Sequence, residues 1–470
     1  MIGKKSIFSL LAILLSVAMA PAIVIPAMAE TETPVTEPTG DPALSTFQQI
    51  NQEGFGNPEN VYAWSMVNFK GEVYVGTWNL GPSSTLIDAL TILPLPRSNP
   101  EPNISAGAEV WKYVGEPSTN SWDMVVDDGL EDNQNMGLRT MLVWDNKADE
   151  KGEAIYGTTL NPYQGLEVWR SYGGKNWDVV VGRELGEDGI DDTYGNGFSS
   201  GDSNESGRGM VAFPDEDGEE RLYVGTIGTN GGEIWRTKKY AYWVGREEGM
   251  RIPTWEKVTD AYTLEGDRNA LAVSGMCLYD DDGNGSYSLF VATWKGDGFS
   301  IYRTDDGSNF DKVATGGIEH PTNMGVQKLI VFQNRLWVLT VNFIRGFDVY
   351  ASRQEAGRIG GNEDWELIVT RGFTDPLNMY AWNAAVYDCD GEGGEPERLY
   401  IGTFNLPRGF YLYSVTPEGE WAVEVGEGSE VPNGINSNLN YGIRTFEVWE
   451  GKLAIGSVGL YKPADVYLAW

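Results

Sequence analysis

The stretch Asn135-Met-Gly-Leu-Arg-Thr-Met-Leu-Val-Trp144 returns near the end of the chain as Asn440-Tyr-Gly-Ile-Arg-Thr-Phe-Glu-Val-Trp449. Asn, Gly, Arg, Thr, Val and Trp recur at matching positions of the two segments. The length of the segment and its β-branched and aromatic residues are typical of a strand that is led by the Asn. A match between segments so far apart indicates an internal repeat whose unit begins with this strand.

Further copies of the unit are marked by two recurring signals. The leading Asn falls in one register at Asn60, Asn135, Asn204, Asn323, Asn378 and Asn440, and Asn269 fits with an offset of one residue. A second strand ends in a small or apolar residue followed by Thr or Ser, at Gly76-Thr77, Gly157-Thr158, Gly225-Thr226, Ala292-Thr293, Leu339-Thr340, Gly402-Thr403 and Gly456-Ser457. The chain therefore contains seven copies of the unit.

Two more strands complete each unit. In the second copy they are Glu167-Val-Trp-Arg170 and Trp177-Asp-Val-Val180, and similar pairs follow the Thr or Ser of other copies. A lone four-stranded sheet cannot bury both of its faces, whereas stacking such sheets around a ring buries them. We therefore predict an all-β fold, a seven-bladed β-propeller of four-stranded antiparallel blades.

The last copy stops at Trp470 after its third strand, so its fourth strand must come from elsewhere. The segment Phe47-Gln-Gln-Ile50 precedes Gly54 by the same spacing as Trp365-Glu-Leu-Ile368 precedes Gly372. We expect this N-terminal strand to close the last blade, which removes an exposed sheet edge.

The N-terminus carries an export signal. Lys4 and Lys5 precede the apolar run 7–25, and Ala27-Met-Ala29 supplies a cleavage site, which together predict a signal peptide, with a retained membrane anchor as the alternative. A Thr-, Pro- and Glu-rich segment that follows has the composition of an exposed linker. The expected division is a signal peptide at 1–29, a linker at 30–44 and the propeller at 45–470. A secreted or cell-surface protein with no stable membrane insertion after cleavage is expected.

Charge and composition limit the partners. The 68 Asp and Glu residues outnumber the 34 Lys and Arg residues, for a net charge of -34. This balance repels phosphate backbones and excludes nucleic acid as a partner. Two cysteines cannot build a disulfide framework, and one histidine leaves little for zinc or histidine-based catalysis.

Two turns resemble the Asp-box hairpins of sialidase-like propellers. They are Ser171-Tyr-Gly-Gly-Lys-Asn-Trp177 and Thr304-Asp-Asp-Gly-Ser-Asn-Phe310, each between a third and a fourth strand. The family pattern is Ser-x-Asp-x-Gly-x-Thr-Trp; both copies are one residue shorter, and the first lacks the Asp. The resemblance implies a propeller, and sialidase-like enzymes use three arginines to grip a carboxylate.

The fourth residue after each registered Asn forms the candidate ligand-binding set. Its members are Trp64, Arg139, Arg208, Gln327, Trp382 and Arg444. Three guanidinium groups near a channel mouth suit a carboxylate ligand, and the two Trp rings suit a sugar face. The alternative is that the arginines pair with local acidic residues and plug the channel. No catalytic pair can be assigned, since nothing in the spacing indicates that Tyr441 is activated as a nucleophile.

One hairpin loop has the spacing of a calcium loop. In Asp280-Asp-Asp-Gly-Asn-Gly285-Ser-Tyr-Ser288, oxygen-bearing side chains alternate and Gly stands at the sixth position. The loop resembles those of integrin-like propellers, which usually carry Asp where Ser288 stands. The expected cofactor is Ca²⁺, with the alternative that the loop is a solvated acidic turn. The expected ligands are Asp280, Asp282, Asn284, Ser286 and Ser288.

The sequence thus predicts an exported or cell-envelope propeller that binds a glycan or an envelope protein without catalysis. The alternative is a glycan-active enzyme, a sialidase-like hydrolase or a lyase, acting on an acidic sugar held by Arg139, Arg208 and Arg444. A purely structural spacer in the envelope is a third hypothesis.

Overall fold

The computed structural model describes residues 34–79, 107–115, 121–147, 151–182, 195–199, 204–242, 251–267, 270–353, 357–389, 397–459 and 462–470, without the side chains of 239–242 and 251. The expected signal peptide and Asn269 lie outside these ranges. Within them the chain forms 28 strands and two short α-helices, so the fold is all-β. Every pairing between these strands is antiparallel.

The strands follow one another in groups of four. The innermost strands are β2 (Asn60–Phe69), β6 (Gly137–Asp145), β10 (Ser206–Pro214), β14 (Ala272–Tyr279), β18 (Gly325–Phe332), β22 (Tyr380–Tyr387) and β26 (Asn440–Trp449). The second strands are β3 (Glu72–Asn79), β7 (Glu153–Leu160), β11 (Glu220–Ile227), β15 (Ser288–Trp294), β19 (Arg335–Val341), β23 (Arg398–Phe404) and β27 (Lys452–Gly459).

The two outer strands are shorter in every group except the third, where β12 and β13 have ten residues each. The third strands are β4 (Val110–Tyr113), β8 (Val168–Ser171), β12 (Glu233–Tyr242), β16 (Ile301–Thr304), β20 (Val349–Ser352), β24 (Leu412–Val415) and β28 (Val466–Ala469). The outermost strands are β5 (Trp122–Val126), β9 (Asp178–Val181), β13 (Arg251–Asp260), β17 (Asp311–Ala314), β21 (Trp365–Val369), β25 (Trp421–Val425) and β1 (Phe47–Gln49).

Helical turns connect some of these strands on the surface. The α-helices are α3 (Ala261–Glu265) and α4 (Asn433–Asn436), and the 3₁₀ turns are η1 (Glu53–Gly56), η3 (Asn196–Ser199) and η5 (Asn362–Asp364). Among the described residues, no helix has the length and apolar character needed to cross a membrane.

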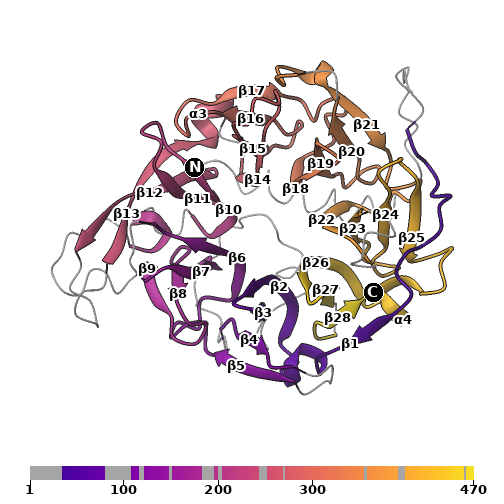
Figure 1. Ribbon diagram of the computed structural model, residues 1–470, viewed down its shortest axis with the longest axis horizontal. Coiled ribbons are helices and arrows are strands. Elements are labelled where there is room, and N and C mark those ends of the chain that lie inside the picture. Colours follow the sequence, from indigo (N-terminus) through magenta and orange to yellow (C-terminus); the bar gives the residue numbers. More distant parts are fainter. Residues whose placement is uncertain are drawn as a thin grey trace, which may run out of the picture.

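The groups are arranged in a ring (Figure 1). Neighbouring groups touch through isolated pairs between a second strand and the next innermost strand, such as Trp78 with Gly137 and Phe404 with Gly442. The contact between Tyr62 of β2 and Val458 of β27 joins the first group to the last. The innermost strands therefore surround one central space.

The N-terminal strand completes the last group, as the sequence predicts. Phe47 pairs with Ala469 and Gln49 with Tyr467, so β1 lies along the outer edge of β28. The buried side chain of Asn51 extends this contact, because its amide donates to the carbonyl of Ala464 and accepts from the amide of Val466. Both chain ends thus share one sheet.

The described part of the expected linker, 34–44, follows the outside of the ring (Figure 1). The amide of Val35 donates to Ile368 of β21, and that of Gly40 donates to Trp421 of β25. The amide of Leu44 donates to the buried carboxylate of Glu424. These contacts fasten the extended segment to the outermost strands.

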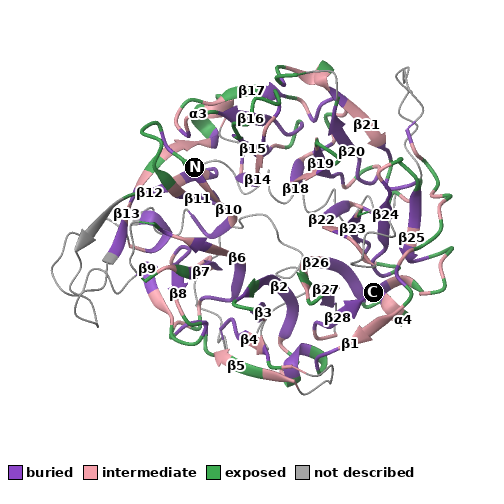
Figure 2. Ribbon diagram, viewed as in Figure 1, coloured by how far each residue is buried: buried purple, intermediate pink, exposed green. Residues whose placement is uncertain are grey.

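The core lies between neighbouring groups, and exposed residues concentrate in the outer loops (Figure 2). Aromatic residues of the third and fourth strands pack in these spaces between groups. Phe198, which precedes β10, stacks on Trp235 with ring centres 4.7 Å apart and meets Trp255 edge-on at 5.2 Å. Stacked pairs of this kind stabilise a fold beyond the area that they bury.

The six registered Asn residues are buried and hold the chain where it enters each innermost strand. The side-chain amide of each donates to the carbonyl of a preceding glycine, namely Gly54, Gly129, Gly197, Gly317, Gly372 or Gly434. Five of the six also donate to an acidic residue at or just before the third strand, namely Glu109, Glu167, Glu233, Asp348 or Asp465. These bonds hold the loop that leads into each of the six innermost strands.

Candidate functional site

Every innermost strand carries a β-bulge at the same place. In β10, for example, the register passes from Gly207 opposite Thr226 directly to Gly209 opposite Gly225, so Arg208 has no partner on β11. The residues skipped in the seven strands are Trp64, Arg139, Arg208, Gly275, Gln327, Trp382 and Arg444. Six of these are the ligand-binding residues predicted from the sequence. Bulges re-aim side chains and are over-represented next to active sites.

We call the seven bulged residues the bulge layer. Each of its three arginines lies over a tryptophan ring. The guanidinium carbon of Arg139 is 5.0 Å from the centre of the Trp64 ring, and that of Arg444 is 5.8 Å from the centre of Trp382. Such cation–π contacts orient a guanidinium group without neutralising its charge. The rings of Trp64 and Trp382 are 4% and 3% exposed, so they support the arginines.

Glycines make room for these rings. A Cβ on Gly137 would lie 2.2 Å from the ring of Trp64, and one on Gly442 would lie 2.1 Å from the ring of Trp382. These glycines stand two residues after the registered Asn, as Asn-Met-Gly and Asn-Tyr-Gly. The repeat therefore encodes the support of the site as well as its arginines.

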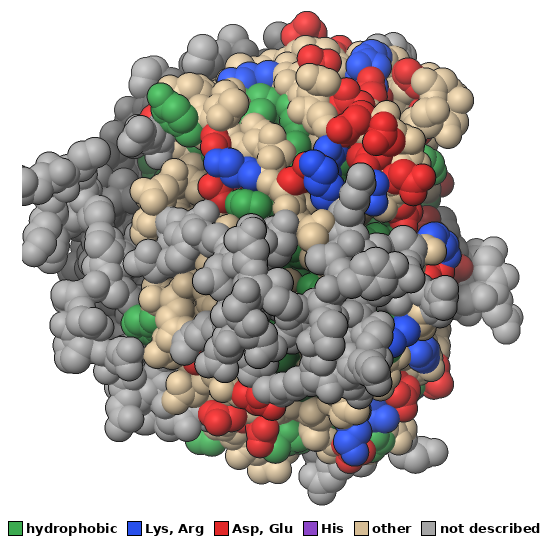
Figure 3. Space-filling model, turned by 90° about the vertical axis from the view of Figure 1, so that its left-hand side faces the viewer, with side chains coloured by type: hydrophobic (Ala, Val, Ile, Leu, Met, Phe, Trp, Pro, Cys, Tyr) green, Lys and Arg blue, Asp and Glu red, His purple; other side chains and the backbone are tan. Residues whose placement is uncertain are grey.

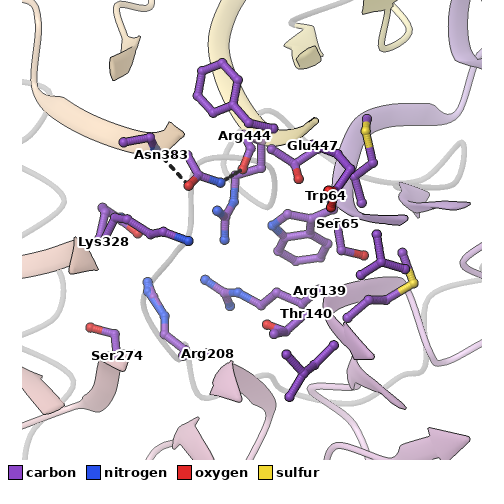
Figure 4. Close-up of a pocket in the computed structure, with 18 of the residues that line it drawn as sticks. Trp64, Ser65, Arg139, Thr140, Arg208, Ser274, Lys328, Asn383, Arg444 and Glu447 are labelled. Carbon is purple, nitrogen blue, oxygen red and sulfur yellow. Dashed lines mark hydrogen bonds between the residues drawn. The ribbon is translucent and has the colours of Figure 1, made fainter. Parts of the chain in front are cut away.

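A cavity of about 430 Å³ lies on the side of the bulge layer that faces the hairpins between the first and second strands. Residues from all seven innermost strands line it, and on β2, β6 and β26 the lining continues toward the hairpin ends of the strands. Figure 4 shows the side chains of Arg139, Arg208, Arg444 and Lys328 pointing toward the middle of this cavity. We refer to it as the central cavity.

The four cations of the central cavity form no ion pair with an acidic side chain of the described residues. Arg139 Nε and both terminal nitrogens of Arg208 are buried and bond no protein atom. On the surface, Lys and Arg side chains lie beside Asp and Glu side chains (Figure 3). In the interior, the buried Arg303 contacts Asp281 at 3.2 Å. Within the described residues, no ion pair of the kind that the alternative requires is formed by these arginines.

Burial and mutual repulsion oppose the charges in the central cavity. Burial lowers the pKa of Arg139 well below its ordinary value, and repulsion from Arg208 and Arg444 adds to this effect. A guanidinium nonetheless stays protonated in proteins. An uncompensated buried charge is costly, so this arrangement favours an anion.

Lys328 and Glu447 line the central cavity but were not predicted from the sequence. Burial lowers the pKa of Lys328, and repulsion from Arg444 lowers it further against the opposing attraction of Glu447. Burial raises the pKa of the Glu447 carboxyl, against the opposing effect of the nearby Lys328 charge. In a regular strand, neighbouring side chains such as Gln327 and Lys328 point to opposite faces of the sheet. The bulge at Gln327 interrupts this alternation, so both residues line the central cavity.

On the other side of the bulge layer, toward the registered Asn residues, aromatic side chains close the centre of the ring. Tyr62 and Tyr441 share a hydrogen bond of 2.6 Å between their hydroxyls, and Tyr380 packs beside them against Phe404. Tyr441 is fully buried, and burial raises its pKa well above the ordinary value, so it is no candidate nucleophile. Within the described residues, the central cavity extends from the bulge layer toward the hairpin ends of the strands.

The predicted calcium loop lies between β14 and β15. Its carboxylates accept backbone hydrogen bonds within the loop, from the amides of Asn284 and Gly285 to Asp280 and from that of Asn284 to Asp282. Asn284 in turn accepts the amide of Ser286, while the buried Ser288 donates to Asp305. Among the described residues, no three His, Cys, Asp or Glu side chains are placed together to hold a metal. Calcium binding stays a prediction.

No protein-family model matches this sequence, and no curated protein matches it. Among solved structures, the polysaccharide lyase Uly1 is 14% identical with a TM-score of 0.42, over 90% of this chain and 92% of the lyase. The Aleuria aurantia lectin, in complex with Fucα1-6GlcNAc, is 11% identical with a TM-score of 0.36, over 80% of this chain and 97% of the lectin. Similarities this distant assign the chain to no family and no activity.

Proposed function

We propose that this chain is a seven-bladed β-propeller that binds a small acidic sugar in its central cavity. The single observation that carries the proposal is the convergence of four cations that pair with no acidic side chain of the described residues (Figure 4). The four-strand groups, their ring order and the joint last sheet support the propeller assignment.

The chemistry of the lining favours a carboxylate. Guanidinium groups bind carboxylates through paired N–H donors, and Arg139, Arg208 and Arg444 offer such donors from three directions. A cavity of about 430 Å³ falls within the size range of small-molecule sites. Ser65 and Thr140 line the same space. Their hydroxyls donate to the carbonyls of Leu138 and Gly207, so they can accept hydrogen bonds from sugar hydroxyls. The whole chain has a net charge of -34, so the cationic lining of this cavity contrasts with the rest of the protein.

Calorimetric titration tests the proposal. D-glucuronate is compared with D-glucose, which has nearly the same shape and no carboxylate, and inorganic phosphate is the second anion. Glucuronate is expected to bind, and Lys328→Met is expected to weaken it at least about tenfold, as loss of a buried charge partner does. Lys175→Met, which removes an exposed cation, is the matched control.

Equal affinity for glucose and glucuronate would overturn the proposal. If phosphate binds and glucuronate does not, the ligand of the cavity is a phosphate and the acidic-sugar proposal is wrong. An unchanged affinity in Lys328→Met would place the ligand outside the central cavity.

A second candidate function, elimination at an acidic sugar, is favoured by Lys328 and Glu447. One titrating group has a lowered pKa and the other a raised pKa in the same cavity, as catalytic acid and base pairs do. A lyase removes the proton beside the bound carboxylate and protonates the departing oxygen, forming a carbon–carbon double bond. Absorbance of that bond in a screen of uronate polymers tests it: loss of turnover in Glu447→Gln is expected, and no turnover by wild type argues for binding alone.

Export to the cell surface and calcium binding by the loop Asp280–Ser288 are further proposals. Calcium is expected to raise the melting temperature of the wild type and to leave Asp280→Ala unchanged. An equal midpoint with calcium and with chelator would contradict the metal site.

A further inference from the structure

A second, smaller cavity lies on the Asn side of the bulge layer. Its volume is about 40 Å³, roughly a tenth of that of the central cavity. It is bounded by Arg139, Arg208, Arg444, Gln327 and the ring of Trp78, together with aromatic and aliphatic side chains. About 10–15 Å³ of such space holds one water-sized particle, so this inner cavity admits a monatomic ion and no sugar.

The polar atoms left without a protein partner around the inner cavity are all nitrogen donors. They are Arg139 Nε, Arg208 Nη1, Arg208 Nη2, Gln327 Nε2 and Trp78 Nε1, and each is buried. Arg139 and Trp78 are 8% and 4% exposed, so more than nine-tenths of each residue is buried. Buried donors in native proteins are nearly always bonded. A set composed only of donors is satisfied best by an acceptor that offers no hydrogen of its own.

The charge balance points the same way. Three guanidinium groups bound the inner cavity and face one carboxylate, that of Glu205. Repulsion from the other two arginines contributes to the lowered pKa of Arg139. A monovalent anion between the three groups would relieve this repulsion, which neutral water would do far less.

We propose that the inner cavity is a halide site, which binds one chloride-sized anion between the three arginines and the indole N–H of Trp78. The halide proposal does not rest on the sugar proposal, although the three arginines border both cavities. Its expected effect is to stabilise the folded ring, because a ligand bound by the native state alone raises the melting temperature.

The test is a melting series of the full chain at constant ionic strength, in which methanesulfonate is replaced by chloride. Methanesulfonate is too large for a cavity of about 40 Å³. We expect the melting temperature to rise by about 2 °C or more over a hundredfold increase in chloride, then to level off. This series on the wild-type protein is sufficient to overturn the proposal. Either an unchanged melting temperature or a linear change without saturation would do so.

Two variants locate the effect. Trp78 borders only the inner cavity and Lys328 only the central cavity. Trp78→Phe is expected to reduce the chloride-dependent rise by at least half, and Lys328→Met is expected to keep it. The reverse pattern would overturn the halide site by moving the anion to the central cavity. Because Lys328→Met also weakens the proposed sugar site, the two proposals can fail separately: chloride dependence without glucuronate binding refutes only the sugar proposal.

Discussion

The guanidinium carbon of Arg208 lies 4.4 Å from the centre of the Trp294 ring, although the two residues belong to neighbouring groups of strands. Trp294 ends β15, and its indole nitrogen donates to the carbonyl of Val326 at 3.2 Å. Its position depends on Gly325, where a Cβ would lie 2.3 Å from the indole ring. An arginine of the bulge layer is thus positioned by a ring that fits only against a glycine.

Gly325→Ala is therefore expected to lower the free energy of unfolding by about 1–3 kcal/mol, as overpacking of a core does. The displaced Trp294 ring would also shift the tryptophan fluorescence and weaken anion binding through Arg208. Chemical denaturation followed by fluorescence measures the first two effects. Gly173→Ala is the matched control, since its Cβ meets no atom within 4 Å. Equal stability of the two variants would contradict the role of Gly325.

The registered Asn residues make a second prediction. Asn135 is fully buried and donates both to the carbonyl of Gly129 and to the carboxylate of Glu167. Asn135→Ala leaves these acceptors short of a donor, which is expected to cost about 1–3 kcal/mol of stability. Asn230→Ala, at an exposed position, is expected to change stability by less than about 0.5 kcal/mol. Similar urea midpoints for both variants would show that the Asn register is dispensable.

The joint last sheet makes a third prediction. Deleting residues 1–50 removes β1 and exposes the edge of β28, whereas deleting residues 1–33 leaves the described chain intact. We expect the longer deletion to lower the melting temperature and to cause self-association, because an open strand edge pairs with other chains. Scanning calorimetry and size-exclusion chromatography measure both effects. Identical profiles for the two deletions would contradict closure by β1.

The registered Asn and the four-strand period made the all-β fold and the pairing of β1 with β28 predictable. The six candidate site residues were also predictable, because one offset from Asn selects them all. Their bulged geometry was not, since a bulge such as that at Arg444 leaves no mark in the hydrophobic pattern. For the same reason Lys328, next to Gln327 in the chain, was missed.

The closure of the ring's centre on the Asn side was not predictable from the sequence. Sequence spacing places Tyr62, Tyr380 and Tyr441 near the Asn ends of their strands, but spacing does not reveal that three rings from distant strands close the centre. Only their contacts show it, such as the Tyr62–Tyr441 hydrogen bond of 2.6 Å. Gly137 and Gly442, which leave room for the rings of Trp64 and Trp382, are visible in the repeat. They are the sequence signal for the packing of these two tryptophans.

The affinity for an acidic sugar is expected to depend on pH. Burial raises the pKa of Glu447, so lowering the pH protonates this carboxyl first and removes a negative charge from the cavity. Burial lowers the pKa of Lys328, so raising the pH removes a positive charge. As the pH rises, deprotonation of Glu447 adds a negative charge and deprotonation of Lys328 removes a positive charge. Both changes weaken the attraction for an anion, so the affinity should fall as the pH rises. Glu447→Gln should bind more tightly near neutral pH and lose the acid limb of the profile. A profile that matches the wild type would exclude Glu447 from the site.

The central claim is tested most directly by a crystal structure of the protein grown with D-glucuronate. We predict electron density for the sugar in the central cavity, with its carboxylate within hydrogen-bond distance, about 2.7–3.2 Å, of the guanidinium groups of Arg139, Arg208 or Arg444. A sugar bound elsewhere, or a carboxylate turned away from all three arginines, would contradict it.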